Sequence, residues 1–192
     1  MRISAQHFLS AQRSGYGFTI IEMMITVTII AIIIGLATPS YQHLVSNNRL
    51  IVTNNDLMTS LALARQNAIS YAKDVYLCEL LDEKTCNEKR PFNADWSKGW
   101  MVFIDNNRNA LLDDKDTISY VSYKPNQKGI AIVFNQQGRL RFRPDGSARS
   151  AGFYLCSRER HKHIFLLYSG RARHNDSLTE KQLKNCHEKL TK

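Results

Sequence analysis

Two arginines near the C-terminus have the spacing and the setting of a phosphate-binding site. Arg171 and Arg173 follow Gly170 in the run Gly170-Arg171-Ala172-Arg173, directly after an apolar segment that predicts a strand. In an extended chain, residues two apart point to the same side, and arginine binds phosphate oxygens in a bidentate manner. Gly170 permits a turn that brings the backbone close to a ligand. The nearby basic residues that could extend this site are Arg158, Arg160, Lys162 and His174.

The positive charge of the chain is concentrated around this run. The formal net charge is +9 and the pI about 9.5. From Arg139 to Lys192, 13 Lys or Arg residues stand against 5 Asp or Glu, a net charge of +8. This imbalance suggests an anionic partner, either nucleic acid or an acidic membrane surface. The alternative is a solvated basic edge, which discourages strand pairing and needs no ligand.

A second polar run, from Asp105 to Asp116, has some of the spacing of a calcium loop. Residues of the EF-hand ligand types occupy positions 1, 3, 5, 9 and 12 of the run. Ala110 stands in place of the turn glycine, and Asp116 is shorter than the usual bidentate Glu. Arg108 and Lys115 also reduce its negative charge. The sequence therefore favours a turn between strands over a calcium site, and we predict no metal or cofactor.

Catalysis finds no support in the sequence. The histidines at 7, 43, 161, 163, 174 and 187 do not accompany a nucleophile motif, and the G-x-S-x-G, P-loop and H-E-x-x-H patterns do not occur. We predict that the chain is not an enzyme and has no small-molecule substrate.

The four cysteines suggest two disulfides. None forms a C-x-x-C pair, and four cysteines allow three connectivities. We favour Cys78 with Cys86, which closes a short loop, and Cys156 with Cys186, which holds the C-terminal segment. The alternative is four reduced, buried thiols, which an exported chain makes less favourable.

The N-terminal segment has the pattern of a single membrane crossing. Residues 1–17 are polar with no acidic residue, and residues 18–37 are nearly all apolar. Twenty helical residues span about 30 Å, the thickness of a bilayer core. Arg2 and Arg13 before the span predict a cytoplasmic N-terminus and a translocated C-terminal part. The alternative is a secretory signal peptide, but the apolar stretch is long for one and no A-x-A site follows.

Glu22 is the one carboxylate inside this apolar stretch. Such a group is costly in a membrane helix unless it finds a partner, which makes it a candidate functional residue. It lies one turn after Phe18. Cleavage before Phe18 would place a new α-ammonium group near it, and the ammonium of a neighbouring subunit could pair with it as well.

The remaining pattern predicts an α+β protein. Apolar residues at three- and four-residue steps continue a helix to about residue 72, kinked near Gly35 and Pro39, and antiparallel strands follow. The expected strands are 75–78, 100–104, 118–123, 130–134, 140–142, 153–156 and 164–168, with a turn at Lys124-Pro125-Asn126. The expected segments are a leader (1–17), a membrane helix (18–38), an amphipathic continuation (39–73), a β-rich head (74–173) and a basic tail (174–192).

The run Gly17-Phe18-Thr19-Ile20-Ile21-Glu22 resembles the N-terminal signal of type IV pilins and type II secretion pseudopilins. The resemblance implies cleavage between Gly17 and Phe18 by a prepilin peptidase, N-methylation of Phe18, and a role for Glu22 in filament assembly. It also implies a type IV pilin fold with a single inner-membrane span. The head would lie in the periplasm and later in an extracellular filament of pilin subunits.

Over its whole length the chain is similar to the FimT/GspH group of minor pilins and pseudopilins. The similar features are the run from Gly99 to Asp105 with the Asn-rich loop after it, the turn from Phe134 to Gly138, and the closing strand. A Gly-Arg-x-Arg run is typical of FimT-like members, which are implicated in DNA capture during natural transformation. The residues that this implies for DNA binding are Gly170, Arg171 and Arg173. Arg160 and Lys162, which are close in the sequence, would extend the site.

We therefore expect a minor pilin whose head binds extracellular DNA. Incoming DNA has arbitrary sequence, so we expect contacts mainly to phosphate and a strong salt dependence. The alternatives without DNA contact are a structural or priming minor pilin, a GspH-type pseudopilin of type II secretion, and an adhesin-like minor pilin.

Overall fold

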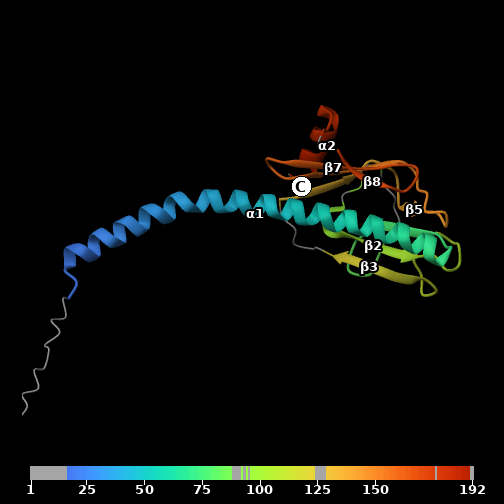
Figure 1. Cartoon of the computed structure of the whole chain (residues 1–192), viewed down its shortest axis with the longest axis horizontal. Coiled ribbons are helices and arrows are strands. Elements are labelled where there is room, and N and C mark those ends of the chain that lie inside the picture. The colour runs from blue at the N-terminus through green and yellow to red at the C-terminus, as the bar shows by residue number, and fades with distance from the viewer. Residues whose placement is uncertain are drawn as a thin grey trace, which may run out of the picture. The chain divides into compact units, whose positions relative to one another are not determined.

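The structure is a computed structural model of the chain, and it describes residues 17–87, 92, 94, 96–123, 129–175 and 177–190. The chain divides into two compact units between Gln42 and His43. The predicted leader lies outside the described residues except for Gly17, and so does the predicted turn Lys124-Pro125-Asn126. The elements are α1 (Ile20–Tyr71), β1 (Val75–Glu79), a 3-10 turn η1 (Trp96–Lys98), β2 (Gly99–Ile104), β3 (Thr117–Tyr123), β4 (Ala131–Phe134), β5 (Leu140–Phe142), β6 (Ala151–Cys156), β7 (His161–Leu166), β8 (Ala172–Asn175) and α2 (Glu180–Leu190), as Figure 1 shows.

The helix α1 is continuous from Ile20 to Tyr71. The kink near Gly35 and Pro39 stays a prediction. In the first unit, the large apolar side chains from Phe18 to Ile34 are each more than half exposed. Among the described residues, no helical segment combines the length and the apolarity that a bilayer crossing needs.

Two antiparallel sheets form the second unit. The first sheet has the strand order β3-β2-β1-β5, and the second sheet has the order β4-β6-β7-β8. Strands that follow one another along the chain pair directly where short turns join them, as β6 does with β7 and β7 with β8. The α+β class with an antiparallel, β-rich head is therefore confirmed.

One hydrophobic core joins α1 to the inner faces of both sheets. Alternate residues of the central strands point toward α1, for example Trp100 of β2 and Phe153 of β6. Figure 1 shows α1 between β2 and β3 on one side and β7 and β8 on the other. Each fully buried leucine in such a core contributes about 1.5–3 kcal/mol. The buried stripe of α1 is the predicted one: Leu50, Leu57, Leu61, Ala64 and Ala68.

The C-terminal segment differs from the prediction. The sequence predicts a polar tail over 174–192, whereas the structure has the end of β8 and the helix α2 there. A capping box explains the start of α2, because the backbone N–H of Thr179 donates to Oε1 of Gln182 at 2.8 Å. Cys186 of α2 then packs on the outer face of the second sheet against Tyr154 and Cys156. One apolar face, one cap and the bond from Cys186 to Cys156 order an otherwise charged segment.

Candidate nucleic-acid interface

The run Gly170–Arg173 begins in the tight connection between β7 and β8, which we call the Gly170 turn (residues 167–171), and ends in β8. The backbone N–H of Leu167 donates to the carbonyl oxygen of Arg171 at 3.0 Å, and that of Gly170 donates to the carbonyl oxygen of Leu167 at 2.9 Å. Gly170 has a φ of 74°. This pattern is a three-residue hairpin loop closed by a glycine bulge, a conformation that a side chain at Gly170 would strain.

The two arginines of the run are exposed at an edge of the head. β8 is the edge strand of the second sheet, and Arg173 lies directly opposite Phe165 of β7. Directly paired residues share a face, so Arg173 lies on the outer face with Phe165, whose side chain is 37% exposed. Alternation along the chain directs Arg171 to the same side. Two exposed guanidinium groups therefore follow one another on one strand edge.

A second turn with the same hydrogen-bond pattern supports the first. This is the Gly146 turn (residues 143–147). The N–H of Arg143 donates to the carbonyl oxygen of Ser147, and the N–H of Gly146 donates to the carbonyl oxygen of Arg143, both at 2.8 Å. The N–H of Ala148 donates to the carbonyl oxygen of Tyr168 at 3.0 Å and joins the two turns. The hairpin that carries the arginines is therefore held by a neighbouring loop.

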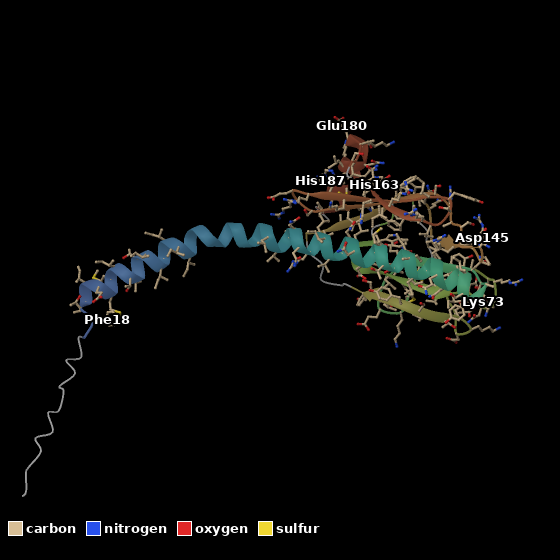
Figure 2. All side chains as sticks on the ribbon, viewed as in Figure 1. Phe18, Lys73, Asp145, His163, Glu180 and His187 are labelled. Atoms are coloured by element: carbon tan, nitrogen blue, oxygen red, sulfur yellow. A yellow bond between two sulfur atoms is a disulfide. The ribbon has the colours of Figure 1, made fainter. Side chains whose placement is uncertain are left out.

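The Gly146 turn in turn lies against the last part of α1. Nε of Arg65 donates to the carbonyl oxygen of Gly146 at 3.3 Å, and Ile69 packs on the same glycine. Figure 2 labels Asp145 of this turn and Lys73, just beyond the end of α1, at the same end of the head. The helix, the Gly146 turn and the Gly170 turn form a stack that fixes the position of Arg171.

The other predicted basic residues do not gather around Arg171. Arg160 lies in the turn between β6 and β7, where its N–H donates to Oγ of Ser157 at 3.1 Å, and the exposed Arg158 belongs to the same turn. This turn is at the opposite end of β7. Lys162 pairs with Leu155, a residue of the inner face, and thus lies on the other side of the sheet from Arg173. The single patch expected from the sequence is split.

Two residues that the sequence analysis did not single out lie next to the Gly170 turn. The guanidinium of Arg143 lies over the ring of Tyr168, 5.7 Å from its centroid, and Tyr168 is 64% exposed. Arg143 follows Arg139 and Arg141 at alternate positions around β5. This alternation, with Leu140 and Phe142 buried between the arginines, is a sequence signal that could have identified a basic strand face.

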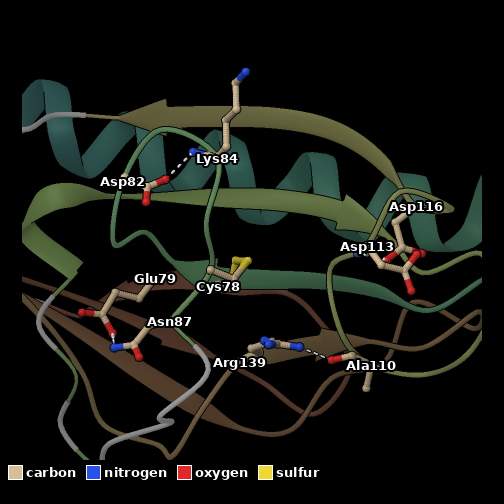
Figure 3. Close-up of a disulfide and its surroundings, with 10 residues drawn as sticks. Cys78, Glu79, Asp82, Lys84, Asn87, Ala110, Asp113, Asp116 and Arg139 are labelled. Carbon is tan, nitrogen blue, oxygen red and sulfur yellow. Dashed lines mark hydrogen bonds between the residues drawn. A yellow bond between two sulfur atoms is a disulfide. The ribbon is translucent and has the colours of Figure 1, made fainter.

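The Asp105–Asp116 loop uses its carboxylates to hold its own backbone. Oδ1 and Oδ2 of the buried Asp105 accept the N–H groups of Arg108 at 2.6 Å and Ala110 at 2.9 Å. Asp116 accepts the N–H groups of Asn106 and Asp113 in the same way. These contacts favour the predicted turn role. Arg139 donates to the carbonyl oxygen of Ala110 and attaches the loop to β5, as Figure 3 shows.

The four cysteines form the two disulfides favoured from the sequence. Cys78 pairs with Cys86 (Cα–Cα 5.7 Å), and Cys156 pairs with Cys186 (Cα–Cα 6.0 Å). The second bond fixes α2 to the second sheet. On the outer face of the same sheet, His163 packs against Tyr154, and burial lowers the pKa of its imidazole from the ordinary value of 6.5. Both ring nitrogens of His163 are buried without a hydrogen-bond partner among the described residues.

At the N-terminal end of the described chain, Thr19 and the residues that follow it form the start of α1. Oγ1 of Thr19 accepts the N–H of Glu22 at 3.2 Å, so Thr19 is the N-cap of α1. Thr19 and Glu22 have the spacing of a capping box, which places the Glu22 carboxylate in the first turn, where the helix dipole favours negative charge. Phe18 precedes the cap and is 77% exposed. Phe18 and Glu22 are therefore both accessible to another subunit.

Comparison with known proteins identifies the family. A family model described as type II transport protein GspH matches residues 53–170, which is more than half of the chain, and the prokaryotic N-terminal methylation motif matches residues 13–38. The crystal structure of the type IV minor pilin FimU from Pseudomonas aeruginosa in space group P21 is similar in fold, with a TM-score of 0.52, 15% identity, and coverage of 67% of this chain and 90% of FimU. FimU in space group P65 gives a TM-score of 0.43 at 15% identity, with 63% and 88% coverage. None of the curated proteins matches the chain. The chain belongs to the GspH family and is a type IV pilin-like subunit of the group that contains minor pilins and pseudopilins.

Proposed function

We propose that this subunit is a minor type IV pilin whose head binds extracellular DNA without sequence preference and supports DNA uptake in natural transformation. The observation that carries the proposal is the placement of Arg171 and Arg173. Both are exposed: Arg171 ends the Gly170 turn, Arg173 lies on the edge strand β8, and the Gly146 turn packs against this hairpin. Guanidinium groups so placed match successive phosphates of a nucleic-acid backbone.

The N-terminal residues account for processing and filament assembly in this proposal. A prepilin peptidase cleaves between Gly17 and Phe18, and the new N-terminus at Phe18 is methylated. Glu22, exposed in the first turn of α1, pairs with the α-ammonium of a neighbouring subunit during filament assembly. The apolar segment after it anchors the subunit in the inner membrane before assembly, with the head in the periplasm.

The second candidate is a structural or priming subunit, either a minor pilin or a GspH-like pseudopilin of type II secretion. The match to the GspH family model favours it, because that match ends at Gly170 and does not include Arg171 and Arg173. This candidate needs neither arginine, so the two functions differ in what these residues do.

A mobility-shift assay with the head, residues 43–192, distinguishes the two candidates. The three hydrophobic clusters lie within these residues, so the head contains its own core. We expect the wild-type head to bind duplex DNA at low salt. Arg171→Gln with Arg173→Gln should weaken binding at least about tenfold, since a hydrogen bond to a charged group contributes about 1.5–3 kcal/mol.

The matched control is Arg49→Gln with Lys84→Gln, which removes the same charge from two exposed positions outside the proposed site. Arg49 lies about 24 Å along α1 from Arg65, the helix residue that contacts the Gly146 turn. Equal weakening by the control and by the arginine pair would refute the motif assignment. Absence of binding by the wild-type head at low salt would favour the structural role.

A further inference from the structure

We infer that a cleft beside β5 is a second phosphate-binding site, which continues the DNA path from the Gly170 turn across the head. The inference rests on the proposed function and adds a location and a set of residues to it. The cleft has a volume of about 190 Å³, and four of its nine lining residues are arginines: Arg139, Arg141, Arg143 and Arg149. This volume leaves room for a phosphate group with bound water.

The arginines converge because of the strand geometry. Leu140 and Phe142 of β5 are buried in the core, so the residues at 139, 141 and 143 point to the opposite side. The exposed Arg149 enters from the segment before β6. Like charges in one cleft repel one another and raise the local positive potential, which an anion would neutralise.

Three of the four arginines have hydrogen bonds within the protein, and Nη1 of Arg143 donates to Oγ of Ser147 at 3.3 Å. Arg141 forms a bidentate ion pair with Asp74, with N–O distances of 2.9 and 2.7 Å. Arg139 donates to the carbonyl oxygen of Ala110. Among the described residues that line the cleft, none carries a carboxylate. The nearest acidic residue along the chain is Asp145, whose Oδ1 accepts the N–H of Ser147 at 2.8 Å within the Gly146 turn.

Arg143 connects the cleft to the Gly170 turn. It lines the cleft, and its guanidinium lies over the ring of Tyr168, which belongs to the Gly170 turn. Tyr168 is followed within the same hairpin by Arg171. A series of three arginines therefore runs from Arg149 through Arg143, whose guanidinium lies over the exposed Tyr168 ring, to Arg171. A ligand that fits this series carries regularly repeated negative charges, as a nucleic-acid backbone does.

The test compares salt dependence in matched variants of the full chain in detergent and of the head. Arg143→Gln with Arg149→Gln is the cleft variant, and Arg143→Lys with Arg149→Lys keeps the charge but removes bidentate binding. Fluorescence anisotropy with a labelled duplex gives the affinity over a salt series. We expect about tenfold weaker binding for the cleft Gln variant. The plot of log K against log salt should become less steep by about 1.8, since two phosphate contacts are lost and each contributes about 0.9 to the slope. The Lys variant should have an intermediate affinity.

A slope equal to that of the Arg49→Gln, Lys84→Gln control would overturn the inference. If the Arg171→Gln, Arg173→Gln variant still loses affinity in that case, the proposed function stands without the cleft. A second measurement follows the Nε–Hε NMR signals of Arg143 and Arg149 during titration with inorganic pyrophosphate. Shifts of these signals in a head that does not bind DNA would show an anion site for another ligand and would contradict the assignment to DNA.

Discussion

A Cβ atom on Gly170 would lie 1.9 Å from the carbonyl oxygen of Gly146, a distance that no side chain can accept. The two glycines thus set how closely the hairpin between β7 and β8 approaches the loop between β5 and β6. The glycine of the Gly-Arg-x-Arg run has a packing role here, and the arginines depend on it for their position.

Gly170→Ala should destabilise the head and weaken DNA binding although it removes no charge. The residue has a φ of 74°, and the new methyl group would collide with the Gly146 turn. We expect a loss of about 2–4 kcal/mol in the free energy of unfolding, measured by urea titration. Gly129→Ala is the control, because Gly129 has a φ of 81° with open space around it. A loss no larger than that of the control would mean that the turns separate freely.

His163→Phe should remove a stability loss that the wild type has at acidic pH. Burial lowers the pKa of His163, so below the ordinary value of 6.5 the unfolded chain takes up a proton that the folded chain resists. The free energy of unfolding of the wild type therefore falls as pH decreases through 6.5, and it is unaffected above that value. Phe keeps a ring against Tyr154 but does not titrate.

The measurement for this prediction is the urea midpoint of both chains at several pH values above and below 6.5. Subtracting the two sets of urea midpoints removes the contribution of the other titrating groups, which both chains share. Parallel curves over the whole range would show that His163 does not contribute to the pH dependence.

Loss of the Cys156–Cys186 bond should cost more than loss of the Cys78–Cys86 bond. The sequence separations are 30 and 8 residues. The chain-entropy model gives about 3.6 kcal/mol for the larger loop and about 2.5 kcal/mol for the smaller. Paired substitutions to alanine, compared by urea unfolding, test the order. Hydrogen exchange should also show loss of protection in α2 only for the pair that includes Cys186, because that bond fixes α2 to the sheet.

Calcium should not change the melting temperature of the head, whereas Asp105→Ala should lower its stability. Both carboxylate oxygens of Asp105 already accept backbone N–H groups in the loop. Removing them leaves two donors without their acceptor, at a cost of about 1–3 kcal/mol. Thermal unfolding with calcium and with a chelator measures the first effect. A calcium-dependent rise in the melting temperature would show that the loop rearranges to bind the ion.

Local patterns predicted most of the fold. The strands stand out because β-branched and aromatic runs alternate with turn residues, and the buried stripe of α1 follows from its helical period. The sequence also contains a signal for the helix α2, since Thr179 and Gln182 have the spacing of a capping box. The high charge of this segment predicts a tail instead.

The arrangement of the candidate site could be predicted only in part. The sequence places Arg171 and Arg173 after a strand, and the structure agrees. It also suggests Lys162 as a neighbour, but β7 begins at His161, and this register turns Lys162 to the other face. The contact between Gly146 and Gly170 joins segments from different sheets, so no local pattern contains it. Arg143 has a local signal in its alternation with buried residues of β5, but its contact with Tyr168 joins segments that are far apart in the sequence.

The Cys156–Cys186 bond also makes the attachment of α2 sensitive to redox conditions. The covalent ring that it closes contains β7, β8 and the whole Gly170 turn. Such a bond forms and persists in oxidising compartments and is rare where glutathione keeps thiols reduced. Before it forms, α2 lies against the second sheet through packing on Tyr154 and the hydrogen bond from Gln182 to Tyr154. The redox state of the surroundings of the head therefore decides whether a covalent bond is added to these contacts.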